Sequence, residues 1–291
     1  MSRFWLAWLG ALCELVMVST SSWAEPHLSL SAPLQPGRAV LVTVAGMPHR
    51  ATVSSAHLGP KELPFTADGL SLVALDMDAK PGPMTLTVMV TDENHREQRL
   101  TQPVMVESRR YHEERLSLPD KKVNLDPDDL ARAEKETAAI RATFSRRGGK
   151  AGFTQGFQMP VKGRISGFFG SRRILNGQPR SPHNGIDISA SQGLPVTVTA
   201  AGVVALTGAN YFFTGNTVMV DHGHGVLSLY AHLDQIAVHQ GEWLDRGATV
   251  GTLGMTGRAT GPHLHWGMMV RGDRVDPLML PGIVTATADD R

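Results

Sequence analysis

Residues 263–270 read HLHWGMMV, a stretch whose pattern indicates a β-strand of a mostly β domain. Alternate residues of a strand share a face. His263 and His265 should therefore point into one cleft, while Leu264 packs into the core. A Gly-Asp turn at 272–273 then predicts a hairpin to a second short strand.

A second histidine motif lies upstream, where residues 183–188 read HNGIDI. His183 and Asp187 are four residues apart, and the Asn-Gly pair between them can turn the chain so that both side chains converge. Ile186 and Ile188 alternate with Asp187, as expected for a strand with one buried face.

The stretch 226–233, VLSLYAHL, is expected to be another strand, paired with 218–221 through a turn at 222–225. By the same alternation, Tyr230 and His232 should share a face. Of the turn histidines, His222 is predicted to stabilise the turn and His224 to be a bystander.

Neutral imidazoles and one carboxylate are the ligands of many catalytic zinc sites, which keep a position open for water. Such a metal polarises a carbonyl and lowers the pKa of water towards about 7. Further histidines nearby could serve as a base and as a transition-state donor. Either motif alone is more often structural than metal-binding, but both in order on predicted strands favour a metal site.

The segment before these motifs is also rich in short strands. Turn signals such as Pro-Gly at 36–37 and Asp-Gly at 68–69 separate them. About seven strands in roughly 80 residues predict a small β-sandwich, immunoglobulin-like in outline. The four clearest strand segments are 38–44, 70–75, 84–90 and 100–106.

A charged connector over 107–150 separates the two β regions. It contains a predicted helix at about 127–146 that Pro127 opens and that basic residues and glycines end. Spacing of three and four residues predicts one weakly apolar stripe along this helix, made of Leu130, Ala133, Thr137, Ile140 and Phe144. The expected domains are the sandwich at 25–106, this connector, a second, histidine-rich β domain at 151–281 and a tail at 282–291.

Residues 1–24 have the features of a signal peptide: Arg3, an apolar run and small residues before a cleavage site after Ala24. The mature protein is therefore expected to be exported, to the periplasm, and to have no membrane span. A lipoprotein is the alternative, but Leu12 before Cys13 disfavours it.

The composition excludes some classes of protein. The 291 residues are 42% hydrophobic and 19% charged, which suits a folded core. The 28 basic and 27 acidic residues give a net charge of +1, so the sequence predicts no nucleic-acid partner. A single cysteine rules out an intrachain disulfide framework.

Taken together, the motifs make the segment 160–281 similar to the lysostaphin-type (LytM-like) zinc metallopeptidase domain. The region before it more loosely resembles the accessory domain of some Gram-negative exported peptidases. The matching stretches are RISGFFGSR at 164–172, HNGIDI at 183–188, AGVV at 201–204, GNTV at 215–218, VDHG at 220–223, YAHL at 230–233 and GRATGPHLH at 257–265.

The resemblance implies that one Zn²⁺ ion is held by His183, Asp187 and His265. It further implies that His263 is the general base and that His232 hydrogen-bonds the scissile centre or the developing oxyanion. The fold would be a Gly-rich, mostly antiparallel β domain with an open groove, and the substrate peptidoglycan. The bond would be Gly-Gly or D-Ala to a diamino acid, the latter favoured by analogy for a Gram-negative protein.

Two other functions stay open at this stage. One is a catalytically inactive wall-binding protein or amidase activator, and the other is a non-haem iron oxygenase. Inactive members typically lack a ligand or a catalytic histidine, whereas all five positions are intact here. The oxygenase pattern usually has His and Asp two residues apart, not four.

A regulatory protein is a second candidate partner, beside peptidoglycan. The aromatic loop 210–215 is either a packed loop or a groove wall that contacts substrate.

Overall fold

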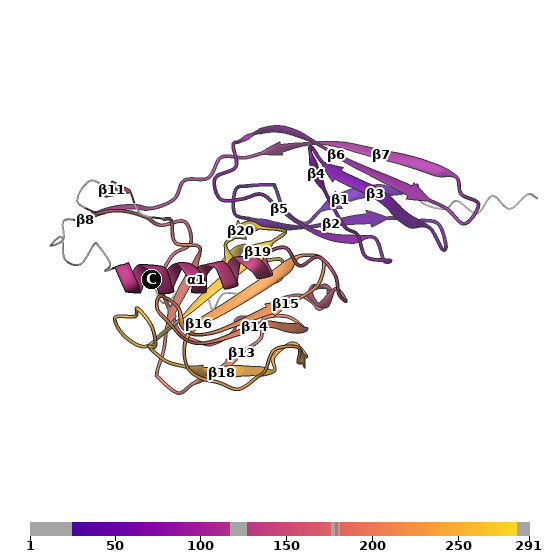
Figure 1. The fold of residues 1–291 in the computed structure, drawn as a ribbon. Coiled ribbons are helices and arrows are strands. Elements are labelled where there is room, and N and C mark those ends of the chain that lie inside the picture. Colours follow the sequence, from indigo (N-terminus) through magenta and orange to yellow (C-terminus); the bar gives the residue numbers. More distant parts are fainter. Residues whose placement is uncertain (1–24, 117–126, 176–177, 180, 284–291) are drawn as a thin grey trace, which may run out of the picture.

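The computed structural model describes residues 25–116, 127–175, 178–179 and 181–283. The predicted signal peptide at 1–24 and residues 284–291 of the predicted tail lie outside this part of the chain. The described residues form a mostly β protein with an N-terminal sandwich, one α-helix and a C-terminal antiparallel sheet, which confirms the predicted fold class (Figure 1).

The N-terminal region consists of two antiparallel sheets, with strand orders β1-β2-β5 and β4-β3-β6-β7. In β2, Val40, Val42 and Val44 are almost fully buried, as the alternating sequence predicts. They share one core with β3 and β6, so the two sheets form a sandwich. The strands are β1 (His27–Leu30), β2 (Ala39–Ala45), β3 (Thr52–Leu58), β4 (Lys61–Glu62), β5 (Leu70–Ala74), β6 (Gly82–Thr91) and β7 (Glu97–Val106).

Strand β5 of the sandwich is buried on both faces. Val73 of β5 points into the sandwich core, whereas Leu72 and Ala74 belong to the core of the C-terminal region. This explains why β5 is apolar at consecutive positions. Arg274 adds an ion pair to Asp76 at 2.5 Å across the same contact.

The connector packs on the C-terminal region through β8 (Glu113–Leu116) and α1 (Pro127–Thr143). β8 pairs in parallel with β10, and α1 crosses the front of the sheet in Figure 1. Ile140 and Phe144 of the predicted apolar stripe pack on Met219. The helix ends before the predicted residue 146 because its last turn tightens into i to i+3 bonds, such as Arg146 N to Thr143 O at 3.1 Å.

The C-terminal region is built on a 10-stranded sheet whose main path runs β17-β14-β15-β16-β19-β12-β9, while β10 and β11 form a separate 3-stranded sheet with β8. β15 and β16 form the predicted hairpin, and so do β19 and β20. Two 3₁₀ turns, at Gly152–Gln155 and Pro277–Met279, flank the sheet. The strands of the region are β9 (Arg164–Gly167), β10 (Arg172–Leu175), β11 (Gln178–Pro179), β12 (Gly185–Ser189), β13 (Pro195–Thr197), β14 (Gly202–Tyr211), β15 (Gly215–Asp221), β16 (Val226–Ile236), β17 (Trp243–Leu244), β18 (Thr249–Leu253), β19 (His263–Val270) and β20 (Asp273–Val275).

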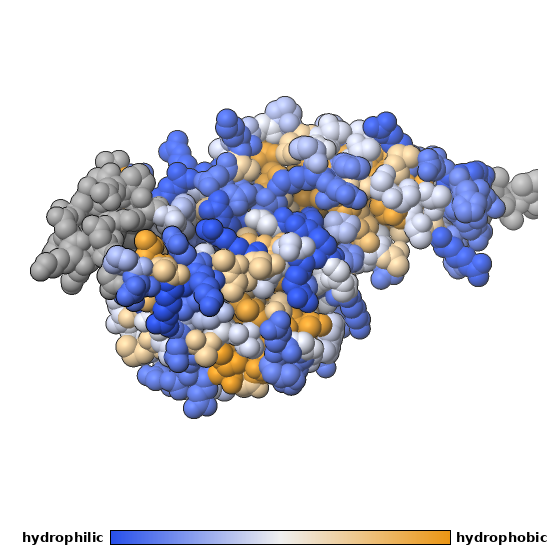
Figure 2. Space-filling view, viewed as in Figure 1, coloured by the Kyte–Doolittle hydropathy of each residue, from blue (hydrophilic) through white to orange (hydrophobic). Residues whose placement is uncertain are grey.

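The surface seen in Figure 2 is a mosaic in which apolar side chains form separate patches among hydrophilic ones. Among the described residues, no helix is long and apolar enough to span a membrane.

Candidate metal centre

Three neighbouring strands position the candidate site. β12 pairs with β19 so that Asp187 lies opposite His265, and β16 pairs with β19 so that Ala231 lies opposite His265. Paired residues of antiparallel strands point to the same side of a sheet. Leu264 is fully buried on the other side, as the alternation predicts.

The donor atoms of His183, Asp187 and His265 all lie within 4.8 Å of one another. Nε2 of His183 is 3.0 Å from Nδ1 of His265 and 3.2 Å from Oδ1 of Asp187, which is itself 3.0 Å from Nδ1 of His265. The sequence motifs, although 82 residues apart between the two histidines, therefore meet at one point.

The hydrogen bonds around this triad suit a metal ion. His183 donates Nδ1–H to the carbonyl oxygen of Phe168 at 3.1 Å, so Nε2 keeps its lone pair for a metal. Two imidazole nitrogens and one carboxylate oxygen are a donor set that fits a zinc ion with an open position. The residues therefore fit the metal that the sequence motifs predict.

Two glycines let the backbone approach the ligands closely. A Cβ atom on Gly167 would lie 2.3 Å from Oδ2 of Asp187, and one on Gly185 would lie 2.9 Å from Nε2 of His265. Any other side chain at these positions would displace a ligand. This gives a physical reason for the glycines in both motifs. The sequence alone did not show that the backbone lies so close to the ligands.

Electrostatics keep the carboxylate ionised. Burial opposes ionisation of Asp187, but the neighbouring imidazoles of His183 and His265 outweigh it and hold the pKa of this carboxyl well below its usual range. Burial also lowers the pKa of His265. An ionised carboxylate beside neutral imidazoles is the protonation state that metal binding needs.

His263 and His232 line the same site. The side chain of His263 donates Nδ1–H to the carbonyl oxygen of Gly261 at 2.8 Å, and its Nε2 is 3.9 Å from Oδ1 of Asp187. The ring of His232 is centred 4.6 Å from that of His263. Burial lowers the pKa of His232 to about 4, so this imidazole is neutral at pH 7.

The expectation that Tyr230 and His232 share a face is wrong. Tyr230 is fully buried beside Trp266 in the core, where its hydroxyl accepts the Thr199 N–H at 2.8 Å. His232 has a left-handed backbone with φ 61°, beside an irregularity in the strand pairing. This conformation breaks the alternation and places the imidazole on the ligand side, and no sequence signal marks it.

The turn histidines lie outside this cluster. His222 is fully buried, with Nδ1 2.9 Å from the carbonyl oxygen of Ala201 and Nε2 2.8 Å from Oγ of Ser228. His224 packs edge-on against Phe153, with ring centroids 5.9 Å apart. Among the described residues, neither belongs to the group that could hold a metal.

Comparison with known proteins places this site in a family. A model of peptidase family M23 matches residues 181–277, which include all three ligands. A crystal structure from Pseudomonas aeruginosa, described as an M23 peptidase, is 30% identical and superposes with a TM-score of 0.63. The similarity covers 86% of this chain and 95% of that one. The chain belongs to peptidase family M23.

Two curated relatives match over a shorter stretch. The peptidoglycan DD-endopeptidase ShyA of Vibrio cholerae is 40% identical over 125 residues, or 43% of this chain and 29% of its own. The DD-carboxypeptidase/endopeptidase Mpg of Neisseria meningitidis is 42% identical over 115 residues, or 40% of this chain and 26% of its own. The matched part therefore spans less than a third of either relative.

Proposed function

We propose that this M23 protein is a zinc-dependent endopeptidase that hydrolyses peptide cross-links of peptidoglycan in the periplasm. The observation that carries the proposal is the convergence of the three ligands His183, Asp187 and His265 with two further imidazoles, His232 and His263. The name of ShyA, a peptidoglycan DD-endopeptidase, supports this substrate class.

In this proposal, His183, Asp187 and His265 hold one zinc ion. When bound, the ion supplies Lewis acidity, which polarises a carbonyl and makes a water more acidic. The protein holds the ligands ready through the Phe168 carbonyl, which orients His183, and through Gly167, which lets Asp187 approach.

His263 is the proposed general base. Its Nδ1–H is donated to the carbonyl oxygen of Gly261, so Nε2 carries the lone pair and accepts a proton from the attacking water. The protonated imidazole can then return that proton to the leaving amine.

His232 is proposed to contact the scissile centre. Because its Nδ1–H is donated to the carbonyl oxygen of Thr256 at 2.8 Å, its Nε2 is an acceptor while the ring is neutral. The oxyanion-stabilising role that the family resemblance implies therefore requires His232 to take up a proton first. In the resting site it is better suited to accept from the water or from a substrate N–H.

The proposal also includes the peptide bond that is cleaved and the compartment in which the protein acts. Cleavage after Ala24 would release the mature protein into the periplasm. A D-Ala to diaminopimelate cross-link is the preferred bond, by analogy with Gram-negative envelopes. The inactive wall-binding or amidase-activating alternative finds no support in this site, since every ligand and both extra histidines are in place.

The test is digestion of purified peptidoglycan by residues 25–291. Zinc-loaded and chelator-stripped samples are compared, with the products identified by mass spectrometry. We expect zinc-dependent loss of cross-linked dimers, and the fragment masses identify the bond. His265→Ala serves as a control that removes a ligand.

Absence of cleavage by a sample shown to contain one zinc per chain would contradict the enzyme proposal. Stimulation of a separate amidase by that same sample would establish the alternative. Equal cleavage by the chelator-stripped protein would instead contradict the role of the metal.

A further inference from the structure

Helix α1 holds the loop that borders the candidate site. This loop, residues 210–215 (NYFFTG), joins β14 to β15 and is called the aromatic loop below. Glu136 of α1 accepts the N–H of Phe212 at 2.6 Å through Oε2. Arg132, one turn earlier, donates to the carbonyl oxygen of Asn210. The connector helix thus contacts the loop backbone at two points.

The two α1 residues support each other. Nε of Arg132 donates to Oε1 of Glu136 at 2.9 Å, so both oxygens of the carboxylate are used. The Glu136 side chain is only 15% exposed, although it lies on the helix surface. A hydrogen bond to a charged acceptor is stronger than a neutral one, more so when it is shielded from water. We call this pair the α1 clamp.

The far end of the aromatic loop is bonded to His232. The carbonyl oxygen of Thr214 accepts the His232 N–H at 2.8 Å. Gly215 lies so close to Thr256 that a Cβ on it would be 2.3 Å from Oγ1, and the Thr256 carbonyl accepts Nδ1–H of His232. The loop therefore supports the backbone of His232 directly, and it lies against Thr256, which holds the ring.

His232 needs this support because its backbone conformation is unfavourable. A non-glycine residue at φ 61° persists only where the surrounding structure holds it. The bonds to Thr214 and Thr256 do so here, and the bond to Thr214 is made by the loop itself.

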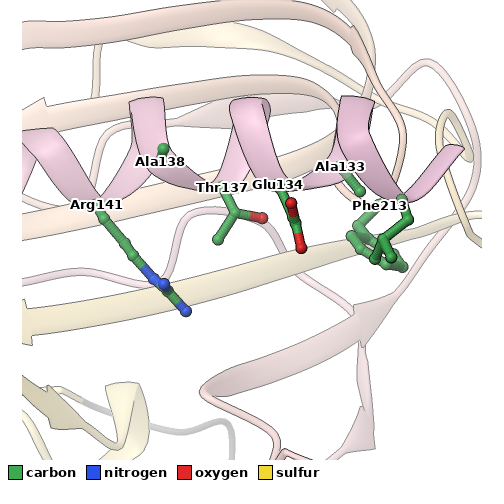
Figure 3. Close-up of a pocket in the computed structure, with 7 residues that line it drawn as sticks. Ala133, Glu134, Thr137, Ala138, Arg141 and Phe213 are labelled. Carbon is green, nitrogen blue, oxygen red and sulfur yellow. The ribbon is translucent and has the colours of Figure 1, made fainter. Parts of the chain in front are cut away.

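Packing holds the outer side of the loop only in part, because Phe213 packs on Phe212 and Arg258 but is open on its other side. A groove of about 630 Å³ separates part of α1 from Phe213, whose side chain is 37% exposed. Figure 3 shows Glu134, Thr137 and Arg141 projecting from α1 along this groove, with Phe213 beside Ala133. Because close packing is incomplete along this groove, the hydrogen bonds of the α1 clamp are needed to place the loop backbone.

We propose that Glu136, supported by Arg132, is a positioning residue of the hydrolytic site. It holds the aromatic loop so that His232 stays beside His263. The inference rests on the proposed function. It means that the connector helix helps to position the hydrolytic site and does not only link the two β regions.

The test compares Glu136→Ala with Glu136→Gln, which keeps a neutral acceptor, and with Glu134→Ala. Glu134 is an exposed glutamate on the same helix, and among the described residues it makes no hydrogen bond to the loop. Three quantities are measured on the zinc-loaded mature protein: kcat and KM on a cross-linked muropeptide dimer, amide exchange of Phe212, and the ring ¹H–¹³C shifts of His232.

For Glu136→Ala we expect kcat to fall by about 10- to 100-fold, since misplacement of about 1 Å costs that much. KM should change little, Phe212 should exchange faster and the His232 shifts should move. The fall in kcat should be smaller for Glu136→Gln, and Glu134→Ala should match wild type in all three measurements.

Unchanged His232 shifts in Glu136→Ala, or unchanged kcat with an active wild type, would overturn the inference. A raised KM with normal kcat would also overturn it, because the loop would then serve binding alone. If wild type itself cleaves nothing, the proposed function fails, and the His232 shifts still decide whether the α1 clamp positions this residue.

Discussion

Gly167→Ala should lower the affinity of the site for zinc, and its effect on folding is measured separately. The added Cβ would lie 2.3 Å from Oδ2 and 2.9 Å from Cγ of Asp187. Real Cβ contacts are essentially never under 3.0 Å, so either Oδ2 or the backbone of Gly167 must move by at least 0.7 Å. Oδ1, the oxygen that faces His183 and His265, belongs to the same planar carboxylate and moves with Oδ2. Metal-ligand distances tolerate about 0.2 Å. The required shift is several times larger, so we expect zinc affinity to fall by at least the ~10–100-fold of a perturbed ligand support.

The matched control is Gly261→Ala, where a Cβ would meet nothing within 4 Å although the residue is close to the site. Zinc affinity is measured by competition with a chromophoric chelator, and metal-free stability by urea unfolding. We expect Gly261→Ala to keep its zinc affinity and to gain about 0.4–1 kcal/mol from a less flexible unfolded chain. Equal zinc affinities for Gly167→Ala and wild type would refute the close-approach argument.

Three further predictions follow from individual side chains. His263→Ala should keep its zinc, measured by metal analysis, but lose about 100-fold or more in turnover; His265→Ala should lose the metal, and the opposite pattern would reverse the two assignments. Burial lowers the pKa of His222 from 6.5 to about 4, so below pH 6.5 the unfolded chain binds the extra proton first. The free energy of unfolding should therefore fall by about 3 kcal/mol between pH 6.5 and 4; a His222→Asn variant that retained the whole slope would contradict this. Tyr230→Phe leaves the buried Thr199 N–H without its acceptor and should cost about 1–3 kcal/mol in urea unfolding while zinc affinity stays unchanged; a loss of zinc would place Tyr230 at the site instead.

The sequence by itself determined the features that depend on local periodicity. Alternation in HLHWGMMV placed His263 and His265 on one side of β19 and Leu264 in the core, because a strand repeats every two residues. The same rule identified the sandwich strands. Motif resemblance supplied the ligand set, and the structure brings those three side chains together.

Only the tertiary structure decided the features that depend on contacts between distant segments. The left-handed turn of the backbone at His232 moves its ring from the core side to the ligand side. Bonds to Thr214 and Thr256 stabilise that conformation, and neither partner is adjacent in the chain.

The connector shows the same division. Its sequence predicts a helix with a weak apolar stripe, and Ile140 and Phe144 of that stripe pack on the sheet, whereas Leu130 is exposed. The reach of Glu136 to Phe212, 76 residues away, cannot be read from the helix pattern. A local pattern specifies which face of an element is apolar, whereas the partners of its polar side chains are chosen by the packing of the whole chain.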